Sequence, residues 1–170
     1  MAGAAAALAL PTAAVAAQGH VRHTRKRSAP ALMLRGVTVS AGGKATKRTV
    51  LVNGAGRAVY LLTGDSARHP KCTGSSCLAI WPALTTRTMK VTVGKGVSGK
   101  VTVWRHHGVD QIEIAGHPLY LYAGDSGSGQ TKGEGVKSFG GTWDLLSGSG
   151  RVVPVPKKSG SGSGGGSSWG

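Results

Sequence analysis

The chain has 170 residues, which is enough for one compact domain with tails and excludes a second large core. It carries 21 Lys and Arg against 6 Asp and Glu, a formal net charge of +15, so anionic partners are favoured and few carboxylates remain for acid–base catalysis. With 29 glycines and an aromatic content of 5%, it is expected to contain many tight turns and few long helices.

The first seventeen residues resemble a secretory signal peptide. They carry no charge, are mostly alanine, and end in small residues where an A-x-A-like cleavage site is expected. The positive n-region usual in such signals is absent, which leaves open an upstream start or an uncleaved segment. We expect residues 1–17 to direct export.

Two segments have the composition of spacers. Residues 18–48 carry eight basic residues and no acid, and their first part lacks apolar periodicity, which predicts a basic linker. Residues 151–170 are rich in Gly and Ser, the composition of a flexible coil. We therefore expect disordered N- and C-terminal tails around a folded domain at residues 49–150, with most of the excess charge in the tails.

Within that domain, short β-branched runs alternate with glycine-rich turns, the texture of an all-β fold. Residues 48–52 and 58–62 flank Asn53–Gly56, whose turn chemistry predicts a hairpin. Helical periodicity is not found. The other expected strands cover residues 88–93, 100–104, the two sides of Ala115–Gly116, 142–146 and 151–155.

Two short motifs are interpreted as turns. Residues 94–101 match G-x-x-x-x-G-K, but Val101 stands where a nucleotide-binding loop needs Ser or Thr, so the segment is predicted to be a hairpin loop. His106–Gly108 is expected to be a turn rather than a metal pair, because adjacent strand residues point to opposite faces.

One phrase occurs twice in the chain. The segment Gly56–Ser66, which ends in "YLLTGDS", aligns without a gap with Gly116–Ser126, which ends in "YLYAGDS". Further on, Trp81 and Trp143 correspond with a shift of two residues. A unit of this size cannot bury its apolar face alone. The sequence therefore predicts a small sandwich or barrel built from two hairpin-containing repeats, at about 49–86 and 101–147.

The repeat resembles a known family. Tyr120–Asp125 fits a Y-x-(F/W/Y)-x-x-D motif, and Cys72–Leu84 is similar to C-x-G-x-C-A-x-x-W-P-P-L. These motifs are typical of secreted-repeat proteins of unknown function, often described as predicted lipoproteins. Here Leu62 replaces the aromatic residue in the first copy, Ala83 replaces a proline, and the cysteines are spaced one residue wider. The resemblance spans about residues 50–146 and implies an exported β fold without an assigned activity; no Cys follows the apolar start, so a lipid anchor is not carried over.

The repeated tyrosines and aspartates are the candidate ligand-binding residues: Tyr60, Asp65, Tyr120, Tyr122 and Asp125. Residues two apart in a strand share a face, so Tyr120 and Tyr122 can form a binding platform with Asp125 at its rim. The alternative places the tyrosines in the core and lets Asp65 and Asp125 bond backbone amides in Gly-Asp-Ser turns. The second interpretation is favoured because a repeated turn needs no ligand to explain it.

Cys72 and Cys77 are the only cysteines, and in an exported protein they are expected to form a disulfide. Closing so short a loop stabilises a fold by about 2 kcal/mol on the chain-entropy model. His69 precedes the pair, but a fourth metal ligand at suitable spacing is lacking, and the C-x-x-C spacing of redox motifs is absent. We expect no metal and no cofactor.

These observations favour a secreted, non-catalytic β-repeat module of unknown ligand, associated with the cell envelope, whose basic tails contact anionic envelope polymers or a lipid surface. A nucleic-acid partner is not expected, because the chain is exported and no aromatic residue interleaves the basic run Arg22–Arg27. We expect a monomer. The alternative is an accessory protein of extracytoplasmic redox or metal chemistry that uses the Cys pair.

Overall fold

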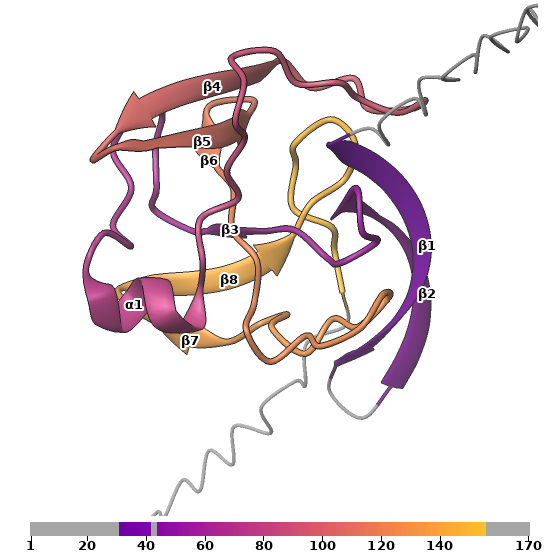
Figure 1. The fold of residues 1–170 in the computed structure, drawn as a ribbon. Coiled ribbons are helices and arrows are strands. Elements are labelled where there is room, and N and C mark those ends of the chain that lie inside the picture. The colour runs from indigo at the N-terminus through magenta and orange to yellow at the C-terminus, as the bar shows by residue number, and fades with distance from the viewer. Residues whose placement is uncertain (1–30, 42–43, 156–170) are drawn as a thin grey trace, which may run out of the picture.

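The structure is a computed structural model that describes residues 31–41 and 44–155. It confirms an all-β fold: three small antiparallel sheets with the orders β1-β2, β3-β8-β7 and β4-β5-β6, and one short helix (Figure 1). The expected signal peptide and residues 156–170 of the expected tail lie outside the described residues. The elements are β1 (Leu32–Ala41), β2 (Lys44–Asn53), β3 (Tyr60–Leu62), α1 (Ser75–Ile80), β4 (Val101–His106), β5 (Val109–Ile114), β6 (His117–Pro118), β7 (Lys137–Ser138) and β8 (Gly141–Leu145).

The first sheet corrects the expected start of the domain. β1 and β2 form the long curved pair at the right of Figure 1, with Leu32 opposite Asn53 and Ala41 opposite Lys44. Residues 32–41 and 44–48 are therefore part of the fold and not a linker. The start of β1 hides its period of two because it is apolar on both faces: Leu32 and Leu34 pack into one core cluster, whereas Met33 packs against the other.

The domain also extends beyond its expected end. Val153 is buried in the core, and its amide donates to the carbonyl of Leu145 at 2.8 Å. Val152 forms an isolated bridge with Leu146. Residues 151–155 thus belong to the fold rather than to the flexible tail.

The expected hairpin around Asn53–Gly56 is present. The amide of Gly56 donates to the carbonyl of Asn53, and the side chain of Asn53 accepts from the amides of Ala55 and Arg57. Gly56 has a φ of 78°, the left-handed region in which glycine avoids the steric cost of a Cβ. The chain therefore reverses at this point, and Val52 bridges Ala58.

Two parts of the chain make matching backbone contacts. The amide of Leu51 in β2 donates to Leu146 at 2.7 Å, and the amide of Ile112 in β5 donates to Leu84 at 2.8 Å. β2 is preceded by β1 as β5 is preceded by β4. We call residues 32–86 the first unit and residues 101–147 the second unit.

The two units exchange strands. β3 of the first unit pairs with β8 of the second, with Tyr60 opposite Leu145. In return, Tyr120 of the second unit bridges Ala83 of the first. The backbone at each tyrosine thus pairs with a residue that lies two positions after the tryptophan of the other unit: Leu145 follows Trp143, and Ala83 follows Trp81.

Four aromatic residues fill the centre between the units. The indoles of Trp81 and Trp143 stack with centroids 3.9 Å apart and planes 4° apart. Tyr60 meets Trp81 edge-on at 5.5 Å, and Tyr120 meets Trp143 edge-on at 5.1 Å. All four side chains are fully buried, so the ring pairs add favourable quadrupole contacts to the burial of a large apolar area.

Two local expectations were wrong. Residues 88–93 form no strand: Met89 is exposed, and the Thr88 hydroxyl donates to the carbonyl of Lys90, a local bond that competes with a ladder. Residues 94–101 therefore are not a hairpin loop. The helix α1, which no periodicity indicated, spans only six residues and begins inside the Cys72–Cys77 loop.

Among the described residues, no helix is long and apolar enough to span a membrane.

Candidate functional site

Tyr60 and Tyr120 lie at the centre of the molecule rather than on a binding surface. Their backbones exchange two hydrogen bonds, Tyr60 N–H to Tyr120 O at 2.9 Å and Tyr120 N–H to Tyr60 O at 3.0 Å. Both residues are 0% exposed. Tyr122 is half-buried, with its ring 4.4 Å from that of Trp81. The structure therefore places the two equivalent tyrosines in equivalent surroundings.

Each of these hydroxyls bonds the aspartate of the other unit. Tyr60 Oη donates to Asp125 Oδ2 at 2.6 Å, and Tyr120 Oη donates to Asp65 Oδ2 at 2.9 Å. The remaining carboxylate oxygens accept backbone amides, from Lys132 to Asp125 at 2.9 Å and from Lys71 to Asp65 at 2.8 Å. The aspartates thus hold their own turns and also join the two units.

Burial shifts the titration of this network. It raises the pKa of Tyr60 and of Tyr120 well above the usual value, and the neighbouring carboxylates Asp125 and Asp65 raise them further. Burial also raises the pKa of Asp65, against the opposing effect of its hydrogen bonds from Lys71 and Tyr120. The phenols therefore remain protonated donors, which suits a role in joining the units.

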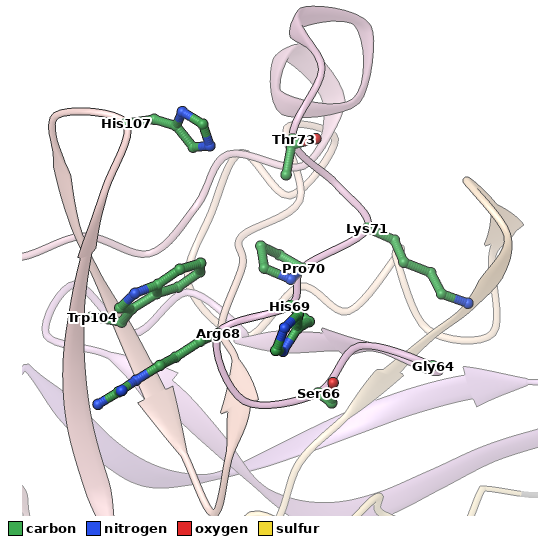
Figure 2. Close-up of a pocket in the computed structure, with 9 residues that line it drawn as sticks. All are labelled: Gly64, Ser66, Arg68, His69, Pro70, Lys71, Thr73, Trp104 and His107. Atoms are coloured by element: carbon green, nitrogen blue, oxygen red, sulfur yellow. The ribbon is translucent and has the colours of Figure 1, made fainter.

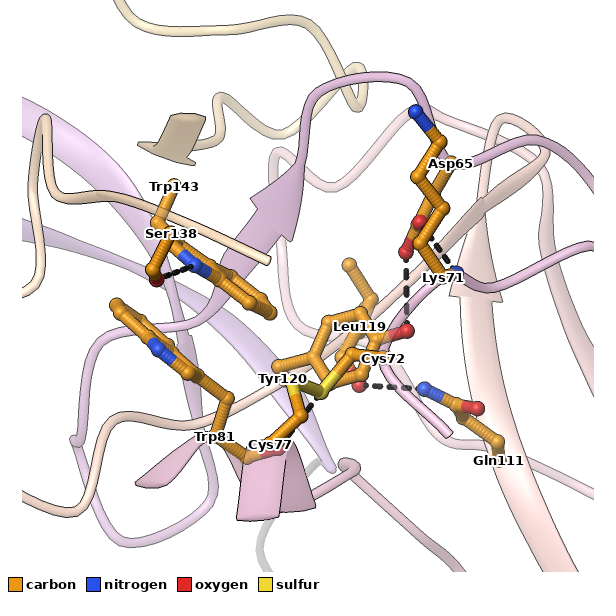
Figure 3. Close-up of a disulfide and its surroundings, with 10 residues drawn as sticks. All are labelled: Asp65, Lys71, Cys72, Cys77, Trp81, Gln111, Leu119, Tyr120, Ser138 and Trp143. Atoms are coloured by element: carbon orange, nitrogen blue, oxygen red, sulfur yellow. Dashed lines mark hydrogen bonds between the residues drawn. A yellow bond between two sulfur atoms is a disulfide. The ribbon is translucent and has the colours of Figure 1, made fainter. Parts of the chain in front are cut away.

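Cys72 and Cys77 form a disulfide at the start of α1 (Figure 3). Both cysteines are 3% exposed and belong to the core cluster that contains Trp81. Within residues 31–41 and 44–155, no three His, Cys, Asp or Glu side chains gather as a metal site. The disulfide therefore fixes the start of the tryptophan segment against the core.

A surface pocket with a cavity volume of about 500 Å³ lies between the loop after β3 and the β4–β5 hairpin (Figure 2). In this view Arg68 and Trp104 are drawn toward one edge, Lys71 toward the opposite edge, and His107 and Thr73 toward one end. We call it the cationic pocket, because its lining contains four basic or imidazole side chains and no acid. Its lining residues are Gly64, Ser66, Arg68, His69, Pro70, Lys71, Thr73, Trp104 and His107.

Buried acids hold the loop that carries these cations. Asp65 accepts the amide of Lys71, and Glu113 Oε1 accepts the amide of Arg68 at 3.0 Å. Glu113 Oε2 accepts the hydroxyl of Thr102, so its second oxygen is also engaged. Because the carboxylates bond the backbone from inside, the side chains of Arg68 and Lys71 remain exposed.

A second cavity of about 300 Å³ adjoins the first and shares Thr73 and His107 with it. We call it the apolar pocket, because aliphatic groups and the disulfide supply much of its lining. Its lining residues are Cys72, Thr73, Leu78, Pro82, Ala83, Thr85, His106, His107, Val109 and Gln111.

His106 is held in one orientation beside the apolar pocket. Its ring stacks on Trp104 at 3.9 Å, and its Nε2 lies 2.8 Å from Gln111 Oε1. Since the Gln111 amide donates to the carbonyl of Leu119, its oxygen accepts, and Nε2 of His106 is the protonated nitrogen. The buried Nδ1 of His106 then has no hydrogen-bond partner among the residues that the structure describes.

Comparison with known families identifies the second unit. Residues 101–147 match the family described as a secreted repeat of unknown function. The match begins at the first residue of β4 and confirms, over this range, the resemblance that the motifs indicated. The description as secreted supports an extracytoplasmic location. No curated protein and no solved structure matches the chain.

The matched range supplies five of the seventeen residues that line the two pockets. Trp104 and His107 come from the β4–β5 hairpin of the matched range, whereas Arg68 and Lys71 come from the first unit. Sequence reasoning missed this site because its members are far apart in the chain and follow no motif. The one local signal in the sequence is Trp104, which lies within the strand pattern of residues 101–106 and is closely followed by His106 and His107.

Proposed function

We propose that the protein is a non-catalytic, extracytoplasmic binding module whose basic surface contacts anionic polymers of the cell envelope. The observation that carries this proposal is the separation of charge in the fold: acids point inward and bases point outward.

All six acids lie in the described residues, and few of them reach solvent. Asp65, Glu113, Asp125 and Asp144 are buried. Asp110 is paired with Arg105, whose Nε lies 2.6 Å from Asp110 Oδ1. The pairing lowers the pKa of Asp110, chiefly through the hydrogen bonds from Arg105. Little negative charge is therefore left to balance the surface cations.

The basic side chains are arranged in the opposite way. In the described part of the chain most Lys and Arg residues are exposed, and they come from both units and from the segment between them. Such a surface attracts polyanions without help from the tails. The exposed residues are Arg35, Lys44, Lys47, Arg68, Lys71, Arg87, Lys90, Lys95, Lys100, Arg105, Lys132, Lys137 and Arg151.

The hydrogen-bond pattern of the buried carboxylates supports a binding role over a catalytic one. Asp65, Glu113 and Asp125 each accept a backbone amide and a side-chain hydroxyl. A general acid or base needs a proton-transfer atom within reach of a substrate. The alternative of redox chemistry at Cys72 and Cys77 requires exchange at two cysteines that are each 3% exposed, which favours the binding module.

The test is retention of the full chain, and of a chain limited to residues 31–155, on immobilised long-chain polyphosphate as salt is raised. Counterion release predicts that affinity falls by about tenfold or more between 50 and 200 mM salt, with a linear log–log slope. The shorter chain should keep most of this slope because the fold itself carries exposed cations. The matched variant replaces Arg87, Lys90 and Lys95 by Gln and should lower the slope, whereas Ser98→Gln should not.

Binding that does not depend on salt, or no binding by either chain, would contradict the proposal. A slope that disappears with the terminal segments would show that the tails, and not the folded surface, hold the polymer.

A further inference from the structure

We propose that the cationic pocket and the apolar pocket together form one site for a small amphiphilic organic anion, a phosphate or carboxylate head group on a short apolar chain. This goes beyond polymer binding, because it assigns a defined small ligand to a defined place between the two units.

The cationic pocket supplies the head-group end. Arg68, His69 and Lys71 stand on one loop, and none of them is paired with a carboxylate at salt-bridge distance in the described residues. Asp65 interacts electrostatically with Lys71, but it is buried and already accepts the Lys71 amide and the Tyr120 hydroxyl. An anion at the mouth therefore meets Arg68 and Lys71 without a salt-bridge partner among the described residues, and Arg68 offers the planar fork suited to a phosphate or carboxylate.

The apolar pocket supplies the end for the chain. Leu78, Pro82, Ala83 and Val109 present carbon to it, and Val109 is 38% exposed although it is a large aliphatic residue. A volume of about 300 Å³ lies at the lower end for ligand pockets and holds a chain of roughly eight carbon atoms. Covering such exposed carbon is favourable by about 25 cal/mol for each Å² removed from water.

The two ends meet at a fixed boundary. Thr73 and His107 line both cavities, and in Figure 2 they face each other at one end of the cationic pocket. His107 has a φ of 45°, a left-handed conformation that few residues other than glycine adopt, followed by Gly108 with a φ of 77°. The turn thus holds the boundary in place.

Titration calorimetry of the full chain with octyl phosphate, inorganic phosphate and octanol tests the two-part site. We expect octyl phosphate to bind at least tenfold more tightly than either fragment. Equal affinity for inorganic phosphate would show that only charge is recognised, and equal affinity for octanol would show that only apolar surface is recognised; either result would overturn the proposal.

Variants then assign each end of the ligand. Arg68→Gln and Lys71→Gln should weaken both octyl phosphate and inorganic phosphate severalfold, whereas the exposed control Lys95→Gln should not. Thr85→Phe adds a ring at the lining of the apolar pocket and should weaken octyl phosphate alone, with Thr88→Phe as its control. Equal losses in the control variants would mean non-specific adsorption and would refute the site.

The same variants separate this proposal from polymer binding. Thr85→Phe leaves every surface cation in place, so its retention on polyphosphate should be unchanged while its affinity for octyl phosphate falls. Near-UV circular dichroism of each variant reports whether the aromatic core is intact. Vesicles that contain phosphatidic acid form a second arm: weaker binding of Thr85→Phe to them identifies a membrane lipid as the source of the ligand, and unchanged binding identifies a soluble one.

Discussion

The hydroxyl of Tyr60 is buried and donates to a carboxylate of the other unit. Asp125 accepts it at 2.6 Å, and the same arrangement joins Tyr120 to Asp65 at 2.9 Å. A hydrogen bond to a charged group contributes about 1.5–3 kcal/mol to the free energy of unfolding, and its loss leaves a buried oxygen unsatisfied. These two bonds therefore link the units at the level of single residues.

The raised pKa values of Tyr60 and Tyr120 predict alkaline instability. Below about pH 10 both phenols are protonated in the folded and unfolded chain, so their contribution to stability is complete. Above that pH only the unfolded chain releases the protons, and the free energy of unfolding should fall by about 1.4 kcal/mol per pH unit for each tyrosine. Urea unfolding between pH 8 and pH 11 measures this slope.

Tyr60→Phe provides the control for this measurement. It removes one of the two titrating phenols and should halve the alkaline slope, while lowering stability at pH 8 by about 2 kcal/mol because the bond to Asp125 is lost. An unchanged slope in this variant would show that other groups cause the alkaline unfolding.

Among the elements, β1 carries more of the core than its sequence suggested. Leu32, Val37 and Val39 are almost fully buried, and the strand pairs with β2 along its whole length. Without β1, β2 would expose the edge that now pairs with β1, and both core clusters would lose apolar side chains that cover them. The fold therefore depends on residues that the basic composition of the segment had assigned to a linker.

A truncation tests this dependence. A chain that begins at Ala31 keeps β1 and should remain folded, whereas a chain that begins at Thr49 should lose cooperative thermal unfolding. Leu32, Val37 and Val39 together account for several kcal/mol of burial, comparable to the whole stability of a small domain. Cooperative unfolding of the shorter chain, followed by circular dichroism, would refute the assignment.

Local chemistry predicted some elements and not others. The turn at Asn53–Gly56 and the reversal at Ala115–Gly116 were found because Asn and Gly permit left-handed conformations, and both are present. The alternating run at 88–93 was wrongly predicted as a strand. Alternation with a period of two gives a strand only when a neighbouring strand pairs with it, and here Val93 makes a single parallel bridge with Leu32. The pockets were not predictable, since Arg68 and Trp104 are far apart in the sequence and meet at one pocket only in the folded chain.

At the scale of the molecule, the sheet β3-β8-β7 and the stacked aromatic centre are built from both units. β3 lacks a partner without β8, and Trp81 lacks its stacking partner without Trp143. The two units are therefore joined by strand pairing, by stacked aromatic rings and by the hydrogen bonds between tyrosines and aspartates.

Separate fragments test this mutual dependence. Residues 31–97 and residues 98–155, produced apart, should each lack a dispersed amide spectrum by nuclear magnetic resonance. Mixed in equal amounts, they should recover dispersion and bind each other as a one-to-one complex, because every exchanged contact is restored. Native-like spectra from either fragment as a monomer would contradict the inferred exchange.

The crossed pairing of phenol and carboxylate also constrains how such proteins grow. A third copy added to the chain would bring one tyrosine and one aspartate whose counterparts are already engaged, so it would need a fourth copy or a second molecule to satisfy them. Chains assembled on this plan should therefore carry even numbers of units. A substitution at one aspartate removes the hydrogen bond of the tyrosine in the other unit, so substitutions in the two units should be correlated during evolution.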